Sequence, residues 1–209
     1  ATGQVNYPGI QADARFNQYL DYLANTNPDT FTNTDEKLSF WINAYNALTI
    51  KGILDGLSPG GFFSRITFFK STKYQVAGME INLYDLERDI IIPFSEPRIH
   101  FAINCASASC PVLIAEAYTA GKLEQQLEAN TIAFLNDATK NKFDLNNKTA
   151  SVSKIFDWFP EDFKQPAGSV QKYLAKYVDN TEVAALLAKD GFRLNYMKYD
   201  WSLNGTAIN

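Results

Sequence analysis

Apolar positions at helical spacing predict two helices in the first quarter of the chain. The first helix covers 12–26 and packs on the core through Phe16, Tyr19, Leu20 and Leu23. The second helix begins after Thr34, a predicted N-cap that is followed by acidic residues in the first turn. Its apolar positions are Leu38, Trp41, Ile42, Tyr45 and Leu48. Both helices therefore have apolar side chains to bury.

Short runs of alternating or β-branched residues predict strands after residue 61. Ala77-Gly78 and Asn146-Asn147 are turn sequences that predict two hairpins. Residues 98–104, rich in β-branched and aromatic side chains, are the best candidate for a central strand. The predicted strands are 66–69, 74–76, 79–81, 98–104, 143–145, 151–153 and 192–201.

Four further segments are predicted to be helical: 83–92, 115–136, 170–177 and 182–189. Helical residues thus outnumber strand residues, and no regular strand-helix alternation indicates a parallel doubly wound sheet. No repeat or linker divides the chain, so residues 1–209 are predicted to form a single domain. The predicted class is a helix-rich α+β fold around a small, mainly antiparallel sheet.

Composition and charge narrow the range of partners. The chain has 209 residues, of which 46% are hydrophobic and 14% aromatic, enough for one sizeable core. Its formal net charge is -4 and it has no basic run, so nucleic acid is not an expected partner. The longest apolar stretch, 40–50, falls short of the roughly 20 residues that a membrane span needs. We expect no membrane-spanning segment.

The start of the sequence and its cysteines favour export. The chain begins at Ala1 and continues with small and polar residues, as a mature protein does after removal of a signal peptide. Cys105 and Cys110 are able to form a disulfide in an oxidising compartment. The expected location is therefore periplasmic or extracellular.

The segment 98–111 contains the only histidine and both cysteines of the chain. A thiol becomes a strong nucleophile when a neighbouring imidazole lowers its pKa. Cys105 is therefore the predicted nucleophile and His100 its base. Ser107 and Ser109 with their backbone N–H groups, and the Asn104 side chain, are the predicted donors to an oxyanion.

Three other interpretations of this segment remain open. On a straight strand His100 and Cys105 lie roughly 16 Å apart, at about 3.3 Å per residue, so a direct pair requires the chain to double back. If it does, Cys110 returns towards His100 or forms a disulfide with Cys105. His100 is otherwise a buried core residue satisfied by hydrogen bonds. One His and two Cys supply only three ligands, so no metal site is predicted.

Two carboxylates are candidates for orienting His100. Glu87 lies on the helix that precedes this segment, and Glu36 lies at the start of the second helix. A carboxylate on the far side of the ring would fix its tautomer. Each is also a candidate for an ordinary solvated charge.

Polar and aromatic residues elsewhere supply candidate binding groups. Asn43 and Asn46 share one face of an otherwise apolar helix, so burial obliges their amides to find partners. They are either structural clamps or site residues. Trp41 and Trp201 are predicted to pack in the core or to contact a ligand at the edge of a cleft.

Four ordered motifs resemble the bacterial branch of the family catalogued as domain of unknown function 547. They are EKLSFWINAYNAL at 36–48, PRIHFAINCASASCP at 97–111, SKIFDW at 153–158 and YDWSLN at 199–204. The resemblance implies an exported bacterial protein. It also implies that Cys105, more than Cys110, is the chemical residue. The His, Cys and acidic set resembles papain-like and transglutaminase-like enzymes, although here the His precedes the Cys.

Two functional hypotheses follow. The first is a cysteine-dependent hydrolase or acyl-transferase acting on an amide or peptide bond, with Cys105, His100 and Glu87 or Glu36 in its site. The second is a non-catalytic secreted binding or scaffold module with a Cys105–Cys110 disulfide, which holds a peptide, glycan or protein. No cofactor is expected, because the sequence has neither a Gly-rich phosphate loop nor a dinucleotide fingerprint.

Overall fold

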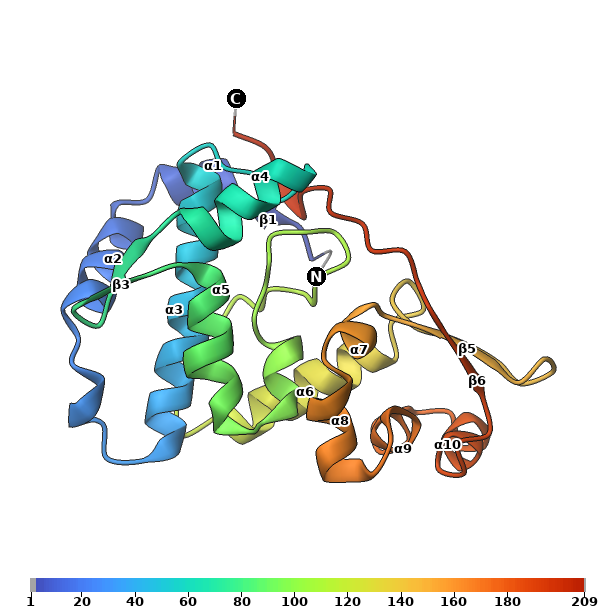
Figure 1. The fold of residues 1–209 in the computed structure, drawn as a ribbon. Helices are drawn as coiled ribbons and strands as arrows, with labels where there is room; N and C mark the ends of the chain where they lie inside the picture. The colour runs from blue at the N-terminus through green and yellow to red at the C-terminus, as the bar shows by residue number, and fades with distance from the viewer. Residues whose placement is uncertain (1–2, 209) are drawn as a thin grey trace.

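Helix α3 (Thr34–Leu54) is the central element of the N-terminal half (Figure 1). The computed structural model describes residues 3–208. From Leu38 to Ile53 most side chains of α3 are buried, which explains why its sequence is apolar on more than one face. The N-cap is Asn33, not the predicted Thr34, and its Oδ1 accepts from the Glu36 backbone N–H at 2.9 Å.

Shorter elements surround α3 in chain order. They are β1 (Val5–Asn6), α1 (Tyr7–Gln11), α2 (Ala14–Asn25), η1 (Pro28–Thr30), α4 (Phe62–Ile66), η2 (Thr67–Ser71), β2 (Tyr74–Val76), β3 (Met79–Ile81), α5 (Leu83–Asp85), η3 (Leu86–Ile91) and η4 (Ile92–Phe94). The hairpin predicted at Ala77-Gly78 is confirmed, and both turn residues have positive φ angles. The strand predicted at 66–69 is wrong, because these residues continue α4 into the π-helical η2.

The predicted central strand at 98–104 is also wrong. Residues 97–101 form the 3-10 helix η5 (Pro97–Phe101), which starts at a proline and is capped by the Glu96 carboxylate. Ile99 packs in the apolar cluster around α3, whereas Phe101 packs in a second cluster. The segment is apolar because it is buried between two clusters, and this composition does not distinguish a strand from a short helix.

The C-terminal half combines a mixed sheet with short helices (Figure 1). Its elements are α6 (Leu123–Leu135), β4 (Lys142–Asp144), β5 (Thr149–Val152), α7 (Ile155–Trp158), α8 (Pro160–Ala167), α9 (Val170–Leu174), α10 (Thr181–Leu187), β6 (Arg193–Tyr196) and β7 (Gly205–Thr206). The predicted hairpin is present as β4 and β5, but α6 begins at Leu123 rather than near 115. Strand β6 pairs in parallel with β5, and β7 pairs in parallel with β1. These two parallel pairs accompany the two antiparallel hairpins, β2–β3 and β4–β5.

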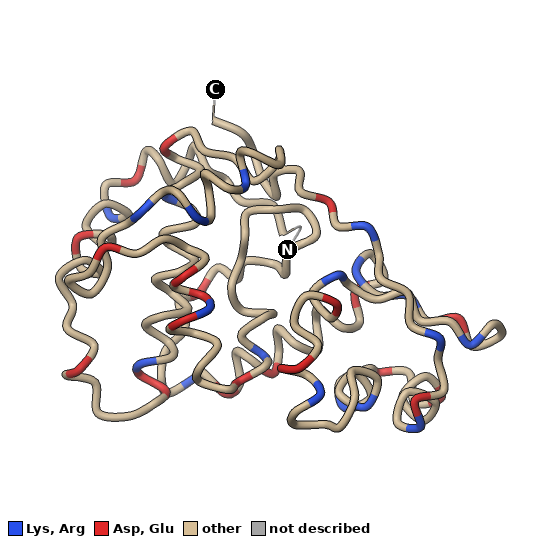
Figure 2. Tube along the Cα trace, in the orientation of Figure 1, with Lys and Arg blue, Asp and Glu red and all other residues tan. Residues whose placement is uncertain are grey.

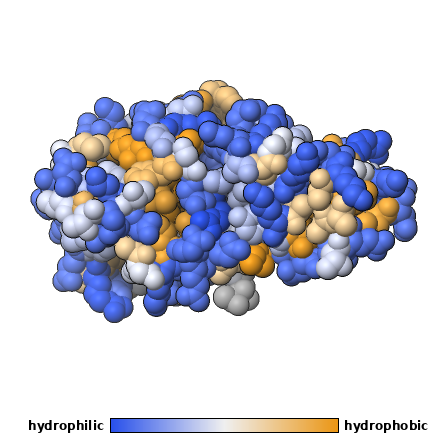
Figure 3. All heavy atoms as spheres, turned by 90° about the horizontal axis from the view of Figure 1, so that it is seen from below, coloured by the Kyte–Doolittle hydropathy of each residue, from blue (hydrophilic) through white to orange (hydrophobic). Residues whose placement is uncertain are grey.

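The helix-rich α+β class predicted from the sequence is confirmed. One apolar cluster surrounds α3, and the second lies among α6, β5, α8 and α9. On the face seen from below, hydrophobic residues form separate patches among hydrophilic ones (Figure 3). Across residues 3–208, no helix is both long enough and apolar enough to span a bilayer.

Candidate functional site

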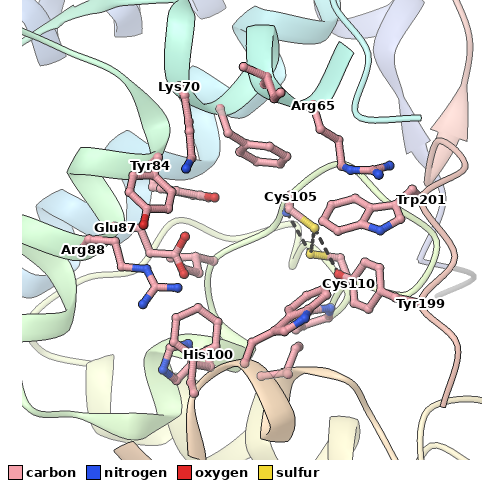
Figure 4. A pocket seen from close by; sticks show the side chains of 18 of the residues that line it. Arg65, Lys70, Tyr84, Glu87, Arg88, His100, Cys105, Cys110, Tyr199 and Trp201 are labelled. Carbon is pink, nitrogen blue, oxygen red and sulfur yellow. Dashed lines mark hydrogen bonds between the residues drawn. The ribbon is translucent and has the colours of Figure 1, made fainter. Parts of the chain in front are cut away.

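A pocket of about 350 Å³ lies where segments from both halves of the chain meet (Figure 4). It brings together five residues singled out by the sequence analysis: Glu87, His100, Cys105, Cys110 and Trp201. Elements distant in sequence supply its walls: α4, η3, η5, the loop after η5, α7 and the C-terminal segment. The pocket is therefore a product of tertiary folding.

The loop that carries the two cysteines doubles back, as the sequence analysis required. Ala106 has a φ of 59°, in the left-handed region that a non-glycine residue seldom adopts. Its backbone N–H donates to Asn104 Oδ1 at 2.8 Å, and its carbonyl accepts from the Asn204 backbone N–H at 3.1 Å. Asn104 Nδ2 donates to the Pro111 carbonyl at 2.6 Å, which joins the two ends of the loop.

Buried asparagines connect this loop to the rest of the molecule. Asn46 of α3 donates to the Ala102 carbonyl at 3.0 Å and accepts from the Asn104 backbone N–H at 2.8 Å. Asn204 Nδ2 donates to Asn104 Oδ1 at 3.0 Å. Asn43 makes the same type of clamp, but to the backbone of Tyr118. Asn43, Asn46 and Asn104 therefore act as structural clamps, and the Asn104 amide is already bound within the loop rather than directed at an oxyanion.

The C-terminal segment pairs with the cysteine loop and delivers two aromatic side chains to the pocket. Ser107 forms a β-bridge with Leu203, and the Ala108 backbone N–H donates to the Ser202 carbonyl at 2.7 Å. This pairing places Tyr199 and Trp201 in the pocket wall. The sequence analysis named Trp201 but not Tyr199 as a site residue.

The Cys105 thiol sits at the centre of a hydrogen-bonding cluster (Figure 4). Its Sγ lies 2.6 Å from Cys110 Sγ, 3.0 Å from Ser107 Oγ and 3.2 Å from Tyr199 Oη. Both cysteines are free thiols. Burial raises the pKa of Cys105, but the hydrogen bonds from Cys110, Ser107 and Tyr199 outweigh it and lower the pKa to about 7. Burial and the neighbouring Cys105 raise the pKa of Cys110. Cys105 is therefore the thiol that ionises first.

His100 is oriented by a carboxylate that the sequence analysis did not find. Its Nε2 lies 2.7 Å from Asp162 Oδ2 of α8, and its ring packs on Phe159 and Phe163 at centroid distances of 4.1 and 5.4 Å. Burial lowers the pKa of His100, although Asp162 opposes this shift, so the ring is neutral at pH 7. The expectation that Glu87 or Glu36 orients the ring is wrong. Among residues 3–208, no hydrogen bond joins His100 to Cys105.

The two carboxylates that were predicted to orient His100, Glu36 and Glu87, lie in different parts of the structure. Glu36 forms a capping box at the start of α3, where its Oε2 accepts from the Thr32 backbone N–H at 2.7 Å. Glu87 lines the pocket, and its side chain has no hydrogen-bond partner among the described residues. Burial raises the pKa of Glu87 to about 7, against the opposing effect of Arg88. Glu87 is thus a carboxyl group able to take up and release a proton near neutral pH.

The two tryptophans predicted as core or ligand-binding residues, Trp41 and Trp201, also lie in different parts of the structure. Trp41 is buried in the core, edge-on to Phe40 at a centroid distance of 4.9 Å, and is not part of the pocket. Trp201 stacks on Trp158 at 5.7 Å in the pocket wall. In the described part of the chain, no group of three or more His, Cys, Asp or Glu side chains is arranged to bind a metal ion.

Fold and site together define a helix-rich α+β protein with a thiol-containing pocket. The model of the family described as "Protein of unknown function, DUF547" matches residues 29–135, more than half of the chain. The protein belongs to this family. The matched region includes Glu87, His100, Cys105 and Cys110, but ends before Asp162. Comparisons with curated proteins and with solved structures gave no match.

Proposed function

We propose that this protein is a cysteine-dependent hydrolase or acyl-transferase that acts on an amide or peptide bond, with Cys105 as its nucleophile. One observation carries the proposal: the Cys105 sulfur lies in the pocket wall within hydrogen-bonding distance of Ser107, Cys110 and Tyr199. Thiols and hydroxyls that donate to a sulfur stabilise its thiolate form, which is the nucleophilic form.

This arrangement differs from a direct Cys–His pair in how the thiol is activated. Ser107 Oγ donates to Tyr199 Oη at 3.1 Å, which leaves the Tyr199 proton available to the Cys105 sulfur. Cys110 supplies a second proton to the same sulfur. The network therefore lowers the cost of forming the thiolate without a base in contact with it.

The proposed reaction has two steps that balance. In the first, the Cys105 thiolate attacks the carbonyl carbon, a C–S bond forms, the bond to the leaving group breaks, and protonated Glu87 gives its proton to that group. In the second, water or another acceptor attacks the thioester, its proton goes to a base of the pocket, and the Cys105 thiolate leaves. That proton then passes from the base to Glu87, which restores the starting state.

His100 is the proposed base of the second step. When the neutral ring donates Nε2–H to Asp162, Nδ1 is the unprotonated, basic nitrogen. The role of Asp162 is to hold the ring in that tautomer and orientation, as carboxylates do beside other catalytic imidazoles. Asp162 is therefore a positioning residue.

The proposal is tested with an activated acyl donor and intact-protein mass spectrometry. A p-nitrophenyl ester should release a stoichiometric burst of p-nitrophenol and leave one acyl group on Cys105. Asp162→Asn should slow the decay of this acyl-enzyme by about 10–100-fold while leaving its formation nearly unchanged. Glu161→Gln, a change at the exposed neighbouring carboxylate, is the matched control. An unmodified Cys105, or an equal burst from Cys105→Ser, would contradict the proposal.

A second candidate function is favoured by the contact between the two sulfur atoms. At 2.6 Å, Cys105 Sγ and Cys110 Sγ need little movement to form a disulfide when an oxidant removes two electrons and two protons. The protein would then be a binding or scaffold module whose aromatic pocket holds a peptide, glycan or partner protein. Its signature is an intact mass two hydrogens lower in protein purified without reductant, together with no acylation after reduction.

We also propose a periplasmic or extracellular location, which follows from the resemblance of the motifs to exported bacterial relatives. Cell fractionation of the native host tests it. Recovery with cytoplasmic marker enzymes would refute it.

A further inference from the structure

We propose that the pocket binds a small acidic acyl compound, with an aromatic or aliphatic body in the cavity and a carboxylate or phosphate group attracted by the positive charges of Arg65, Lys70 and Arg88. As a substrate assignment, this inference rests on the proposed function of Cys105. As a statement about binding, it depends only on the walls of the pocket.

The charge of the pocket is opposite in sign to that of the whole chain. The chain has a formal net charge of -4, and its acidic and basic residues are interspersed along both halves (Figure 2). The pocket wall instead carries three cations, Arg65, Lys70 and Arg88, and one carboxylate, Glu87, among the described residues. Such a local excess attracts anions into a cleft.

None of the three cations forms an ion pair with a carboxylate of the described residues. Within residues 3–208, the ion pairs of the structure involve other basic residues, and Lys70 and Arg88 have no side-chain hydrogen bonds. Arg65 makes only long contacts with the Pro59 and Gly60 carbonyls, at 3.3 and 3.4 Å. Their capacity to bind an anion is therefore unused inside the protein.

Aromatic rings hold these cations beside the pocket. Arg65 lies 4.7 Å above the Trp201 ring, Lys70 lies 4.1 Å above Tyr84, and Arg88 lies 4.4 Å above Phe159. Figure 4 shows Lys70 and Arg88 on the side of Glu87 and Arg65 on the side of Trp201, with the cysteines between them. Cation–π contacts fix the position of a charge without neutralising it. An acyl group at Cys105 is thus approached by positive charge from two sides.

The remainder of the pocket is suited to an apolar body. Its lining is mainly aromatic and aliphatic, and two side chains of α4 at the pocket, Phe62 and Ile66, are 66% and 41% exposed. Large apolar side chains exposed at a cavity indicate a binding surface. The volume of about 350 Å³ lies at the lower end of the range for small-molecule pockets. Size and lining therefore favour a small amphipathic ligand.

The binding test uses ligands that share a phenylalkyl body and carry terminal groups of different charge. Cys105→Ser protein is titrated with 3-phenylpropionate, phenethyl phosphate, 3-phenylpropionamide and 3-phenylpropylamine, and fluorescence of Trp158 and Trp201 reports binding. We expect at least one anion to bind roughly tenfold or more tightly than the amide, and the amine to bind weakest. The tighter of the two anions identifies a carboxylate or a phosphate as the natural group. Equal affinity for the amide, or no binding of either anion, would overturn the inference.

Charge-removing variants test which residues hold the anion. Arg65→Gln, Lys70→Gln and Arg88→Gln should each weaken binding of the preferred anion by roughly three- to tenfold and leave the amide unchanged. Lys189→Gln removes one positive charge from the exposed turn after α10 and is the matched control. An equal loss in Lys189→Gln would mean that the effect is one of net charge, and the proposed site would be withdrawn.

Acylation of the wild-type protein separates failure of this inference from failure of the proposed function. If anions bind selectively but no ester acylates Cys105, the pocket is an anion site without acyl transfer. If a neutral ester acylates Cys105 as fast as its acidic counterpart, acyl transfer stands and the substrate assignment fails.

Discussion

The two sides of the pocket differ in how their polar groups are satisfied. On one side, Cys105 and Tyr199 belong to a network in which each polar atom has a partner within the protein. On the other side, Glu87, Lys70 and Arg88 have no side-chain hydrogen bond or ion pair among the described residues. Polar groups inside proteins are normally partnered, so unpartnered ones in a pocket are free to bind a ligand. In the proposed function the first side positions the nucleophile, and the second side receives the charged group of the ligand.

Replacing the nucleophile is the strongest test of the partnered side. Cys105→Ser should reduce acyl transfer by at least about a thousandfold, because a hydroxyl in this position is far less ionised than the thiol. The measurement is the rate of p-nitrophenol release under single-turnover conditions. Cys110→Ala retains the nucleophile and should keep measurable activity. Loss of activity in Cys110→Ala but not in Cys105→Ser would mean that Cys110 is the nucleophile, which would contradict the proposal.

Removing the clamp at the base of the loop tests what holds the partnered side in place. Asn104→Ala deletes three buried hydrogen bonds, to Pro111, Ala106 and Asn204, and should lower the free energy of unfolding by about 3 kcal/mol. Urea denaturation measures the change. Asn146→Ala, in the exposed turn between β4 and β5, should have almost no effect. Similar losses in both variants would show that Asn104 is not a special clamp.

Replacing Glu87 with a neutral residue tests the unpartnered side through the pH dependence of the free energy of unfolding. Burial raises the pKa of Glu87 from 4.5 to about 7, so the folded state binds more protons than the unfolded state between these values. The contribution of Glu87 to stability is therefore most favourable below about pH 4.5 and is lost as the pH rises through 7. Glu87→Gln should match the wild type at pH 4 and be more stable at pH 8, by on the order of 2 kcal/mol.

Urea denaturation at a series of pH values measures this difference. Glu80→Gln, at an exposed position in β3, serves as the control and should follow the wild-type profile. A Glu87→Gln profile parallel to the wild type would mean that Glu87 titrates normally and that the pocket does not desolvate it.

Removing one donor to the thiol has the smallest expected effect. The pKa of Cys105 is about 7 in the presence of the Tyr199 hydroxyl. Tyr199→Phe should raise it by about one unit, since one charge-assisted hydrogen bond to the thiolate is lost. The pH dependence of alkylation by iodoacetamide reports the midpoint. Tyr196→Phe, at an exposed tyrosine of β6, should leave the midpoint unchanged. A fixed midpoint in Tyr199→Phe would remove Tyr199 from the activating network.

Local signals in the sequence were sufficient for some elements. The β2–β3 hairpin was predicted because its turn residues and its alternation lie within eight residues of one another. The position of α3 followed from its apolar spacing, and only its cap moved by one residue, to Asn33. Such features depend on backbone preferences and neighbouring side chains.

Sequence signals failed where a segment is buried on several sides, because its pattern of apolar residues then has no helix or strand period. Residues 98–104 are apolar because they lie between two clusters, and no periodicity separated a strand from η5. Partners far apart in the sequence were also missed. Asp162 lies 62 residues from His100, and Tyr199 lies 94 residues from Cys105. No spacing rule connects residues at such separations.

The sequence by itself determined the α+β class, the family, the importance of the segment from His100 to Cys110, and Cys105 as the residue to test. Tertiary structure decided the rest: Asp162 as the partner of His100, Tyr199 as a donor to the thiol, and a rim of cations around the pocket. The physical reason is the range of each interaction. Backbone preferences and apolar periodicity act over a few residues, whereas hydrogen bonds, desolvation and charge act between whichever groups the packing of the two clusters brings together.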